Sequence, residues 1–170
     1  QRVGRGKYSF GETRHYSPKI NYKMKKIGQL IKRKYPFINY CQWELSSVNM
    51  FSQHLINFNI HFVDVERDAV ESVYYGLKES FSKVMHIKNL YDNLSEFADS
   101  IIVRPLVTDS PVEKKENTYI ASLEKMLVDL CTDREFISFQ GNEIYHIFQN
   151  AFDKYTVNKQ TMLRYGGRKN

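Results

Sequence analysis

Between Phe37 and Pro105, short apolar segments alternate with amphipathic segments, and this alternation limits the folds that the chain can adopt. The short segments are rich in β-branched and aromatic residues, which favours β-strands. One of them is almost continuously apolar, so we expect that strand to be central in a sheet. The predicted strands lie at Ile38–Trp43, Ile60–Val65 (the nearly continuously apolar one), Val84–Ile87 and Ser100–Val103.

The segments between these strands have the residue spacing of helices that pack on a sheet. In Asp68–Phe81, apolar residues recur at the intervals of one helix face. Two shorter helices are also predicted, one beginning at Ser46 or Ser47 and one at Leu90–Phe97. Strands and helices that alternate at this spacing form right-handed βαβ units. The sequence therefore predicts an α/β fold with a small, mainly parallel sheet flanked by helices.

The first 36 residues divide into two parts. Residues 1–18 contain closely spaced glycines and an alternating polar and aromatic stretch at Lys7–Phe10, a pattern typical of a β-hairpin. Residues 19–36 predict a basic helix, because Ser17-Pro18 supplies a cap and a first-turn proline. Pro36 ends this helix, since the residue before a proline disfavours helical backbone angles.

Residues 37–170 are predicted to form one α/β domain, and its C-terminal part, residues 119–170, is predicted to be helical. The polar stretch 105–118 contains two prolines, which predicts a connecting loop. We expect the last helix to end at Gly166-Gly167. The predicted helix starts in this part are Ser122, Asn142 and Asn158.

Positive charge is concentrated at the N-terminus. Residues 1–40 contain eleven Lys and Arg and one acid, Glu12, whereas the other 130 residues carry a net charge of −4. Ordinary protein surfaces intersperse the two signs, so this imbalance favours contact with a polyanion over a merely solvated helix face. The basic residues expected to contact DNA are Arg2, Arg5, Lys7, Lys25, Lys26, Lys32 and Arg33.

Composition predicts a cytoplasmic domain without a membrane partner. The longest apolar runs, such as Ile101-Ile102-Val103, are too short to cross a bilayer, and no charged and then apolar leader opens the chain. Cys41 and Cys131 lie far apart in the sequence, and we expect both to be reduced, buried thiols.

Each catalytic motif that we considered lacks a residue that it requires. Gly4 and Gly6 precede Lys7, but the Ser or Thr of a phosphate-binding loop is missing. The histidines and cysteines have no zinc spacing, so no metal or other cofactor is expected. One alternative stays open. Three acids near strand ends would suit a metal-dependent nuclease of the restriction-endonuclease type, although Asp68 stands where such enzymes carry a lysine. These acids are Glu44, Asp64 and Glu66.

Two segments resemble a known family. Arg2–Phe10 resembles the wing and last strand that close the winged-helix domain of AbiEi-like abortive-infection antitoxins, and Tyr119–Leu130 resembles a helix typical of their C-terminal domain. A looser similarity runs through Ile101–Pro105 and Met162–Tyr165. The resemblance implies that residues 1–18 are a remnant of the winged helix, whose recognition helix would precede Gln1.

The resemblance also implies a function. Antitoxins of this family bind promoter DNA, repress their own operon and neutralise a cognate nucleotidyltransferase-like toxin. We therefore expect a transcriptional autoregulator that is not an enzyme, with operator DNA and the toxin as partners. For the toxin we expect the outer face of the C-terminal helices and the basic tail to be used, because Arg and Tyr are enriched in interface hot spots. A solvated terminus is the competing interpretation. The candidate residues are Lys154, Lys159, Arg164, Tyr165 and Arg168.

Overall fold

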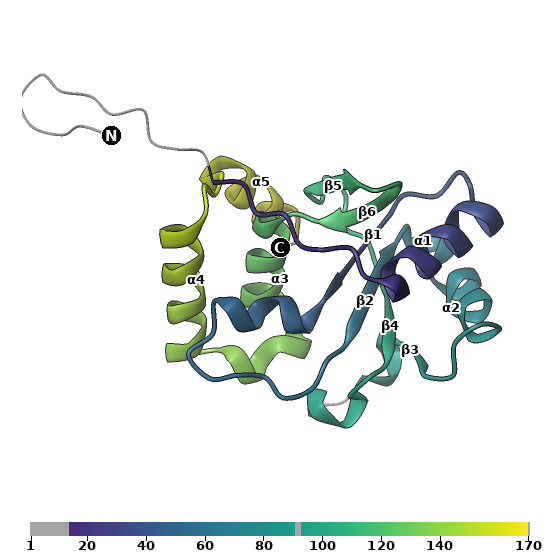
Figure 1. The fold of residues 1–170 in the computed structure, drawn as a ribbon, viewed down its shortest axis with the longest axis horizontal. Coiled ribbons are helices and arrows are strands. Elements are labelled where there is room, and N and C mark those ends of the chain that lie inside the picture. The colour runs from purple at the N-terminus through teal and green to yellow at the C-terminus, as the bar shows by residue number, and fades with distance from the viewer. Residues whose placement is uncertain (1–13, 91–92, 170) are drawn as a thin grey trace, which may run out of the picture.

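A mixed six-stranded sheet lies between two layers of helices (Figure 1). The computed structural model describes residues 14–90 and 93–169. The strands are β1 (Tyr40–Glu44), β2 (His61–Val65), β3 (Val84–His86), β4 (Ile101–Pro105), β5 (Val112–Lys115) and β6 (Thr118–Ala121). Their order is β3-β4-β2-β1-β6-β5. The pairs β3–β4, β2–β4 and β1–β6 are parallel, which confirms the predicted α/β fold with a mainly parallel sheet.

Among the described residues, five α-helices flank this sheet. They are α1 (Tyr22–Lys34), α2 (Val70–Lys78), α3 (Leu123–Thr132), α4 (Asn142–Lys154) and α5 (Lys159–Lys169). Short 3-10 helices connect the elements: η1 (Leu45–Met50), η2 (Arg67–Ala69), η3 (Ile87–Asn89), η4 (Leu94–Phe97) and η5 (Arg134–Phe139). Helices α1 and α2 cover one face, and α3, α4 and α5 lie on the other (Figure 1). No helix among the described residues is long and apolar enough to cross a bilayer.

Alternation along the central strands sends side chains to the two faces in turn. Val63 and Val65 of β2 belong to the core beneath α1 and α2, whereas Phe62 belongs to the core beneath α3 and α4. Asp64 therefore lies on the α3 side of the sheet. Arg104 of β4 is its partner in the β2–β4 register and points to the same side. This register places an acid and a base side by side inside the molecule.

Helix α1 starts later than predicted. Its cap is Asn21, whose side chain accepts a hydrogen bond from the backbone N–H of Met24 at 2.9 Å. Ser17 is not a cap, because its hydroxyl accepts a hydrogen bond from Lys115 of β5 at 2.8 Å. The segment before α1 thus runs against the β5–β6 hairpin. The predicted helix start at Ser17-Pro18 was wrong.

The hairpin formed by β5 and β6 replaces a predicted loop and the first turn of a predicted helix. Residues 112–121 pair as antiparallel strands, and β6 joins the sheet through a parallel register of Ile120 with Gln42. The turn residues Glu116 and Asn117 have φ values of 47° and 62°. A two-residue turn with both φ values positive matches the twist of a hairpin. The prediction missed this turn because it contains no glycine.

The first connections of the sheet also differ from the prediction. Strands β1 and β2 are antiparallel, so the first strand pair is not a βαβ unit. Their connection contains η1 and no α-helix. Only Leu94–Phe97 of the predicted helix 90–97 is helical among its described residues, as η4.

The C-terminal helix starts agree with the prediction at two of three positions. Ser122 and Asn158 both act as caps. Each side chain accepts a hydrogen bond from the backbone N–H of the residue three positions later. Asn142 is instead the first helical residue and follows Gly141, whose φ is 87°. Helix α5 continues past Gly166-Gly167 to Lys169. Cys41 is buried as predicted, whereas Cys131 is exposed.

Candidate functional site: a basic groove beside a buried ion network

A network of charged side chains is buried between the sheet and helix α3. Arg104 donates two hydrogen bonds to Asp64, at 2.7 and 2.8 Å, and one to Asp129 at 3.1 Å. The remaining guanidinium nitrogen donates to Asp133 at 3.2 Å and to Glu135 at 2.8 Å. Lys125 lies one helical turn before Asp129. The ion network consists of Asp64, Arg104, Lys125, Asp129, Asp133, Glu135, Tyr165 and Lys169.

The two innermost carboxylates of the ion network are held in the charged form. Lys125 donates to Asp64 at 2.5 Å and to Asp129 at 2.6 Å. Burial raises the pKa of both carboxyl groups, but Arg104 and Lys125 outweigh burial and lower it below the usual range. The guanidinium also lies 4.7 Å from the ring centroid of Phe62. Arg104 and Lys125 therefore occupy the carboxylate oxygens of Asp64 and Asp129 that a metal ion or a substrate would have to bind.

Helix α5 closes the ion network from the outside. The hydroxyl of Tyr165 donates to Asp129 at 2.8 Å, and Lys169 donates to the same oxygen at 2.6 Å. Lys169 also forms an ion pair with Asp133. Tyr165 is only 1% exposed. This tyrosine is therefore a core residue, and its predicted role in binding a partner was wrong.

The three acids of the nuclease alternative do not converge. Glu44 stands opposite His61 at one end of the β1–β2 ladder, and Glu66 follows β2 at the other end. Five residues of strand separate the two ends, roughly 16 Å. Glu44 accepts from Asn21 at 2.9 Å, and Asp64 is held in the ion network. No group of His, Cys, Asp or Glu able to hold a metal ion occurs within residues 14–90 and 93–169.

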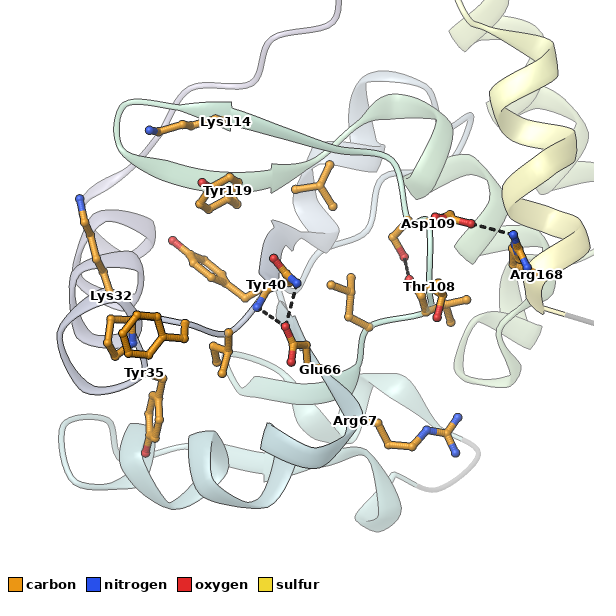
Figure 2. Close-up of a pocket in the computed structure, with 18 of the residues that line it drawn as sticks. Lys32, Tyr35, Tyr40, Glu66, Arg67, Thr108, Asp109, Lys114, Tyr119 and Arg168 are labelled. Atoms are coloured by element: carbon orange, nitrogen blue, oxygen red, sulfur yellow. Dashed lines mark hydrogen bonds and ion pairs between the residues drawn. The ribbon is translucent and has the colours of Figure 1, made fainter.

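A groove of about 1210 Å³ opens at the end of the sheet where β2 and β4 finish and β1 and β6 begin (Figure 2). Its walls come from α1, the β5–β6 hairpin, the loop after β4 and the end of α5. Lys169 and Asp133 line both this groove and a smaller cavity of about 270 Å³ over the ion network. The groove therefore joins the surface to the network.

The acids that line the groove are occupied by partners within the protein. Glu66 accepts two hydrogen bonds from Asn39, at 2.7 and 2.8 Å, and Asp109 pairs with Arg168 at 3.0 Å. The other acid, Asp133, belongs to the ion network. Figure 2 shows the first two contacts inside the groove. The charges of Asp109 and Asp133 are thus balanced by cations of the protein, whereas Glu66 keeps its charge and is held by the neutral side chain of Asn39.

Three cations that line the groove form no ion pair with any residue that the structure describes. They are Lys32 of α1, Arg67 of η2 and Lys114 of β5. Lys32 and Lys114 lie at one end in Figure 2, and Arg67 lies toward the other end. The groove therefore carries an excess of positive charge, contributed by three separate elements.

Two aromatic side chains present free surface to the groove. Phe37 is 94% exposed and Tyr119 is 40% exposed. The ring of Tyr119 is fixed by an edge-on contact with Tyr40, with centroids 5.5 Å apart. Lys114 and Tyr119 are direct partners in the hairpin register, so both side chains stand on one face. Positive charge and a flat ring thus occur side by side.

The predicted DNA-binding residues of α1 lie on two faces of the helix. Lys25 pairs with Glu116 of the hairpin at 3.2 Å, and Lys32 is seven residues further on, facing the groove. Lys26 lies over the rings of Tyr22 and Phe81, on the side of α2. Arg33, also exposed, follows seven residues after Lys26. Three further predicted residues lie outside the described range: Arg2, Arg5 and Lys7.

The predicted partner-binding residues are spread over two surfaces. Lys154, Lys159 and Arg164 are exposed on α4 and α5. Lys154 bonds to the carbonyl of Met50, and Lys159 lies 5.4 Å from the ring centroid of Phe152. Arg168 faces the groove instead. The structure thus joins one predicted partner residue and one predicted DNA residue, Lys32, in the same groove.

Sequence reasoning missed both the groove and most of the ion network. Arg104 had a usable signal, since an arginine interrupts an otherwise apolar strand at Ile101–Pro105 and needs a buried acid. Lys125 and Asp129 interrupt the apolar face of α3 in the same way. No local sequence pattern indicated that Arg67 and Lys114 would line the same groove as α1.

The fold and the groove define a mixed α/β domain with a groove lined by basic and aromatic side chains. Over residues 1–170 the chain matches DUF6577, a family of unknown function, and it belongs to that family. Comparison with curated proteins and with solved structures gives no match.

Proposed function

We propose that this protein is the antitoxin and transcriptional autoregulator of a toxin–antitoxin pair and acts in the cytoplasm. It would bind operator DNA through its basic N-terminal part and a nucleotidyltransferase-like toxin through its C-terminal domain. One observation carries the choice of a binding protein over a nuclease. The acids of the nuclease alternative lie apart or are bound by the protein's own side chains. By contrast, Lys32, Arg67 and Lys114 line an open groove and form no ion pair with any described residue.

The exposed cations of α1 support the DNA-binding part of the proposal. Lys25, Lys26, Lys32 and Arg33 are all exposed, and the helix contains no acid. Cations of this kind neutralise phosphates and position a protein on DNA without reading bases. The similarity of Arg2–Phe10 to a winged-helix wing also supports this part of the proposal.

The exposed surface of α4 and α5 supports the toxin-binding part. Three cations of these helices, Lys154, Lys159 and Arg164, are exposed, and so is the apolar Leu163 of α5, at 77%. A basic surface with apolar contacts suits an acidic or nucleotide-bearing surface of a partner. Tyr165 and Arg168 are not part of this surface.

Growth rescue tests the toxin-binding part. The proposal predicts a gene for a nucleotidyltransferase-like protein beside this one. Cells that express that protein should stop growing and should recover when the chain is co-expressed. The variant Lys154→Ala/Lys159→Ala/Arg164→Ala should lose rescue. A matched variant with the same charge change, at exposed residues far from α4 and α5, should keep it: Lys78→Ala/Lys83→Ala/Lys88→Ala. No rescue by the unaltered chain would contradict the proposal. Equal rescue by both variants would show that Lys154, Lys159 and Arg164 do not contact the toxin.

A gel-shift assay with the promoter fragment of the protein's own gene tests the DNA-binding part. Replacing the four α1 cations by Ala should weaken binding to promoter and unrelated duplex by a similar factor. The slope of log affinity against log salt should fall by up to about 0.9 for each phosphate that is no longer neutralised. An unchanged slope would remove α1 from the DNA surface. Mg²⁺-dependent cleavage of the fragment would contradict the proposal of a binding protein.

A further inference from the structure

The groove is separate from the surface that we propose for the toxin and mostly separate from the α1 surface for DNA. Arg67 and Lys114 belong to neither, and Lys32 alone is shared with the DNA surface. The groove is also larger than the roughly 300–1,000 Å³ typical of sites for small ligands. Its occupant is therefore better sought among extended chains than among small metabolites.

Charge identifies one property of that occupant. Five cations and three acids line the groove. Asp109 and Asp133 have cationic partners in the protein, whereas Lys32, Arg67 and Lys114 form no ion pair with the described residues. Because these cations stand toward opposite ends of the groove (Figure 2), a ligand that satisfies all of them carries several negative charges along its length. A phosphodiester backbone has this form.

The aromatic residues identify a second property. Phe37 and Tyr119 expose ring surface in the same groove, and Tyr119 is held in place by Tyr40. Bases of a single strand stack on such rings, and the contact tolerates any sequence because every base has a flat face. In a duplex these faces are already stacked. An acidic peptide supplies charges but has no requirement for flat rings.

We propose that the groove binds a short single-stranded nucleic acid, with phosphates on Lys32, Arg67 and Lys114 and bases on Phe37 and Tyr119. This site goes beyond the proposed antitoxin function and does not depend on it. It would give the protein a nucleic-acid contact that is independent of its promoter DNA.

Fluorescence anisotropy with labelled dT12 and rU12 tests this proposal on the full chain. The variant Arg67→Ala/Lys114→Ala leaves the proposed DNA and toxin surfaces intact. Each phosphate of a single strand that is neutralised contributes about 0.7 to the salt slope, so removing two cations should lower the slope by about 1.4 and the affinity at 0.1 M salt by about 25-fold. The matched control Arg14→Ala/Lys83→Ala has the same charge change away from the groove and should bind nearly as the unaltered chain does.

A second variant separates stacking from apolar contact. Phe37→Leu/Tyr119→Leu keeps apolar bulk but removes the flat rings, and it should weaken binding by about tenfold for each base that is stacked. Tyr75→Leu/Tyr145→Leu alters two exposed rings outside the groove and serves as its control. With 4-thiouridine in the RNA strand, ultraviolet crosslinks should map to residues 35–40 or 112–119.

The outcomes distinguish this site from the proposed function. Groove variants that lose oligonucleotide binding while they keep growth rescue and promoter binding support the site, and the dT12 and rU12 arms show whether DNA or RNA is preferred. The proposal is overturned if the groove variants bind like their controls. It is also overturned if a 12-base-pair duplex or a deca-glutamate peptide binds as tightly and with the same dependence on the groove residues.

Discussion

Replacing Arg104 by methionine should destabilise the protein more than any surface change. The substitution keeps most of the side-chain length but removes the charge and all five hydrogen bonds that Arg104 donates to carboxylates. Arg104 is only 4% exposed, so water cannot replace these bonds. Lys125 and Lys169 would be left to balance four acids.

The size of the effect follows from this loss of balance. Breaking a buried ion pair by removing one partner costs about 3–5 kcal/mol, because the remaining charge stays buried. A chain of this length loses about 2–4 °C of melting temperature for each kcal/mol, so Arg104→Met should melt roughly 6–20 °C lower. Arg168→Met is the matched control. It breaks a half-exposed ion pair with Asp109, and such pairs are worth about 0–1 kcal/mol.

The pH dependence adds a sharper test. The pKa values of Asp64 and Asp129 are lowered in the folded protein, so their stabilisation is present above the unfolded value of about 3.9 and is lost as pH falls through the folded values. Without Arg104, burial should raise the pKa of these carboxyl groups above the unfolded value, so that the folded variant takes up protons between pH 7 and pH 4 and the unfolded variant does not. The difference in unfolding free energy between the unaltered chain and Arg104→Met should therefore shrink from pH 7 to pH 4. Urea unfolding measures it, and an equal loss in Arg168→Met or a pH-independent difference would refute this reasoning.

Three further changes test other parts of the structure. Tyr165→Phe removes the hydroxyl that donates to the ion network at 2.8 Å, and it should cost about 1.5–3 kcal/mol in urea unfolding; no loss would show that the bond is dispensable. Gly28→Ala places a methyl group 2.6 Å from the hydroxyl oxygen of Thr118, so it should cost about 1–3 kcal/mol in a thermal scan, and a higher melting temperature would contradict the tight packing of α1 on β6. With a thiol reagent at pH 8, exposed Cys131 should react in the native protein while Cys41, buried with its pKa raised to about 12, reacts only in denaturant; two fast native thiols would contradict this placement.

The central part of the sheet was predictable because its signals are local. Ile60–Val65 is nearly continuously apolar, and the structure places His61–Val65 as β2 inside the sheet. Ser122 and Asn158 were identified as caps because a short polar side chain directly precedes a helical periodicity. Such patterns depend only on neighbouring residues.

The β5–β6 hairpin was not predictable in the same way. Its strands are four residues long, and its turn uses Glu116 and Asn117 in place of the glycine that usually marks such a turn. The antiparallel register of β1 with β2 likewise depends on contacts across the sheet, which no local periodicity encodes.

The candidate site depends still more on long-range contacts. Arg104, Lys125 and Tyr165 all bind Asp129, and they can do so only after the sheet, α3 and α5 have packed together. Asp64 was identified from the sequence as a chemically important acid, but its role as the partner of two buried cations follows only from the register of β2 and β4. Sequence reasoning could therefore identify charged residues but not their partners.

The central claim is that this protein is a binding partner of a toxin, and a calorimetric titration tests it most directly. The purified chain is titrated into the nucleotidyltransferase-like protein that the proposal expects to be encoded beside its gene. We predict saturable binding with a dissociation constant of about 1 μM or tighter. The variant Lys154→Ala/Lys159→Ala/Arg164→Ala should weaken that binding, whereas Lys78→Ala/Lys83→Ala/Lys88→Ala should not. Absence of binding between two folded proteins would contradict the claim.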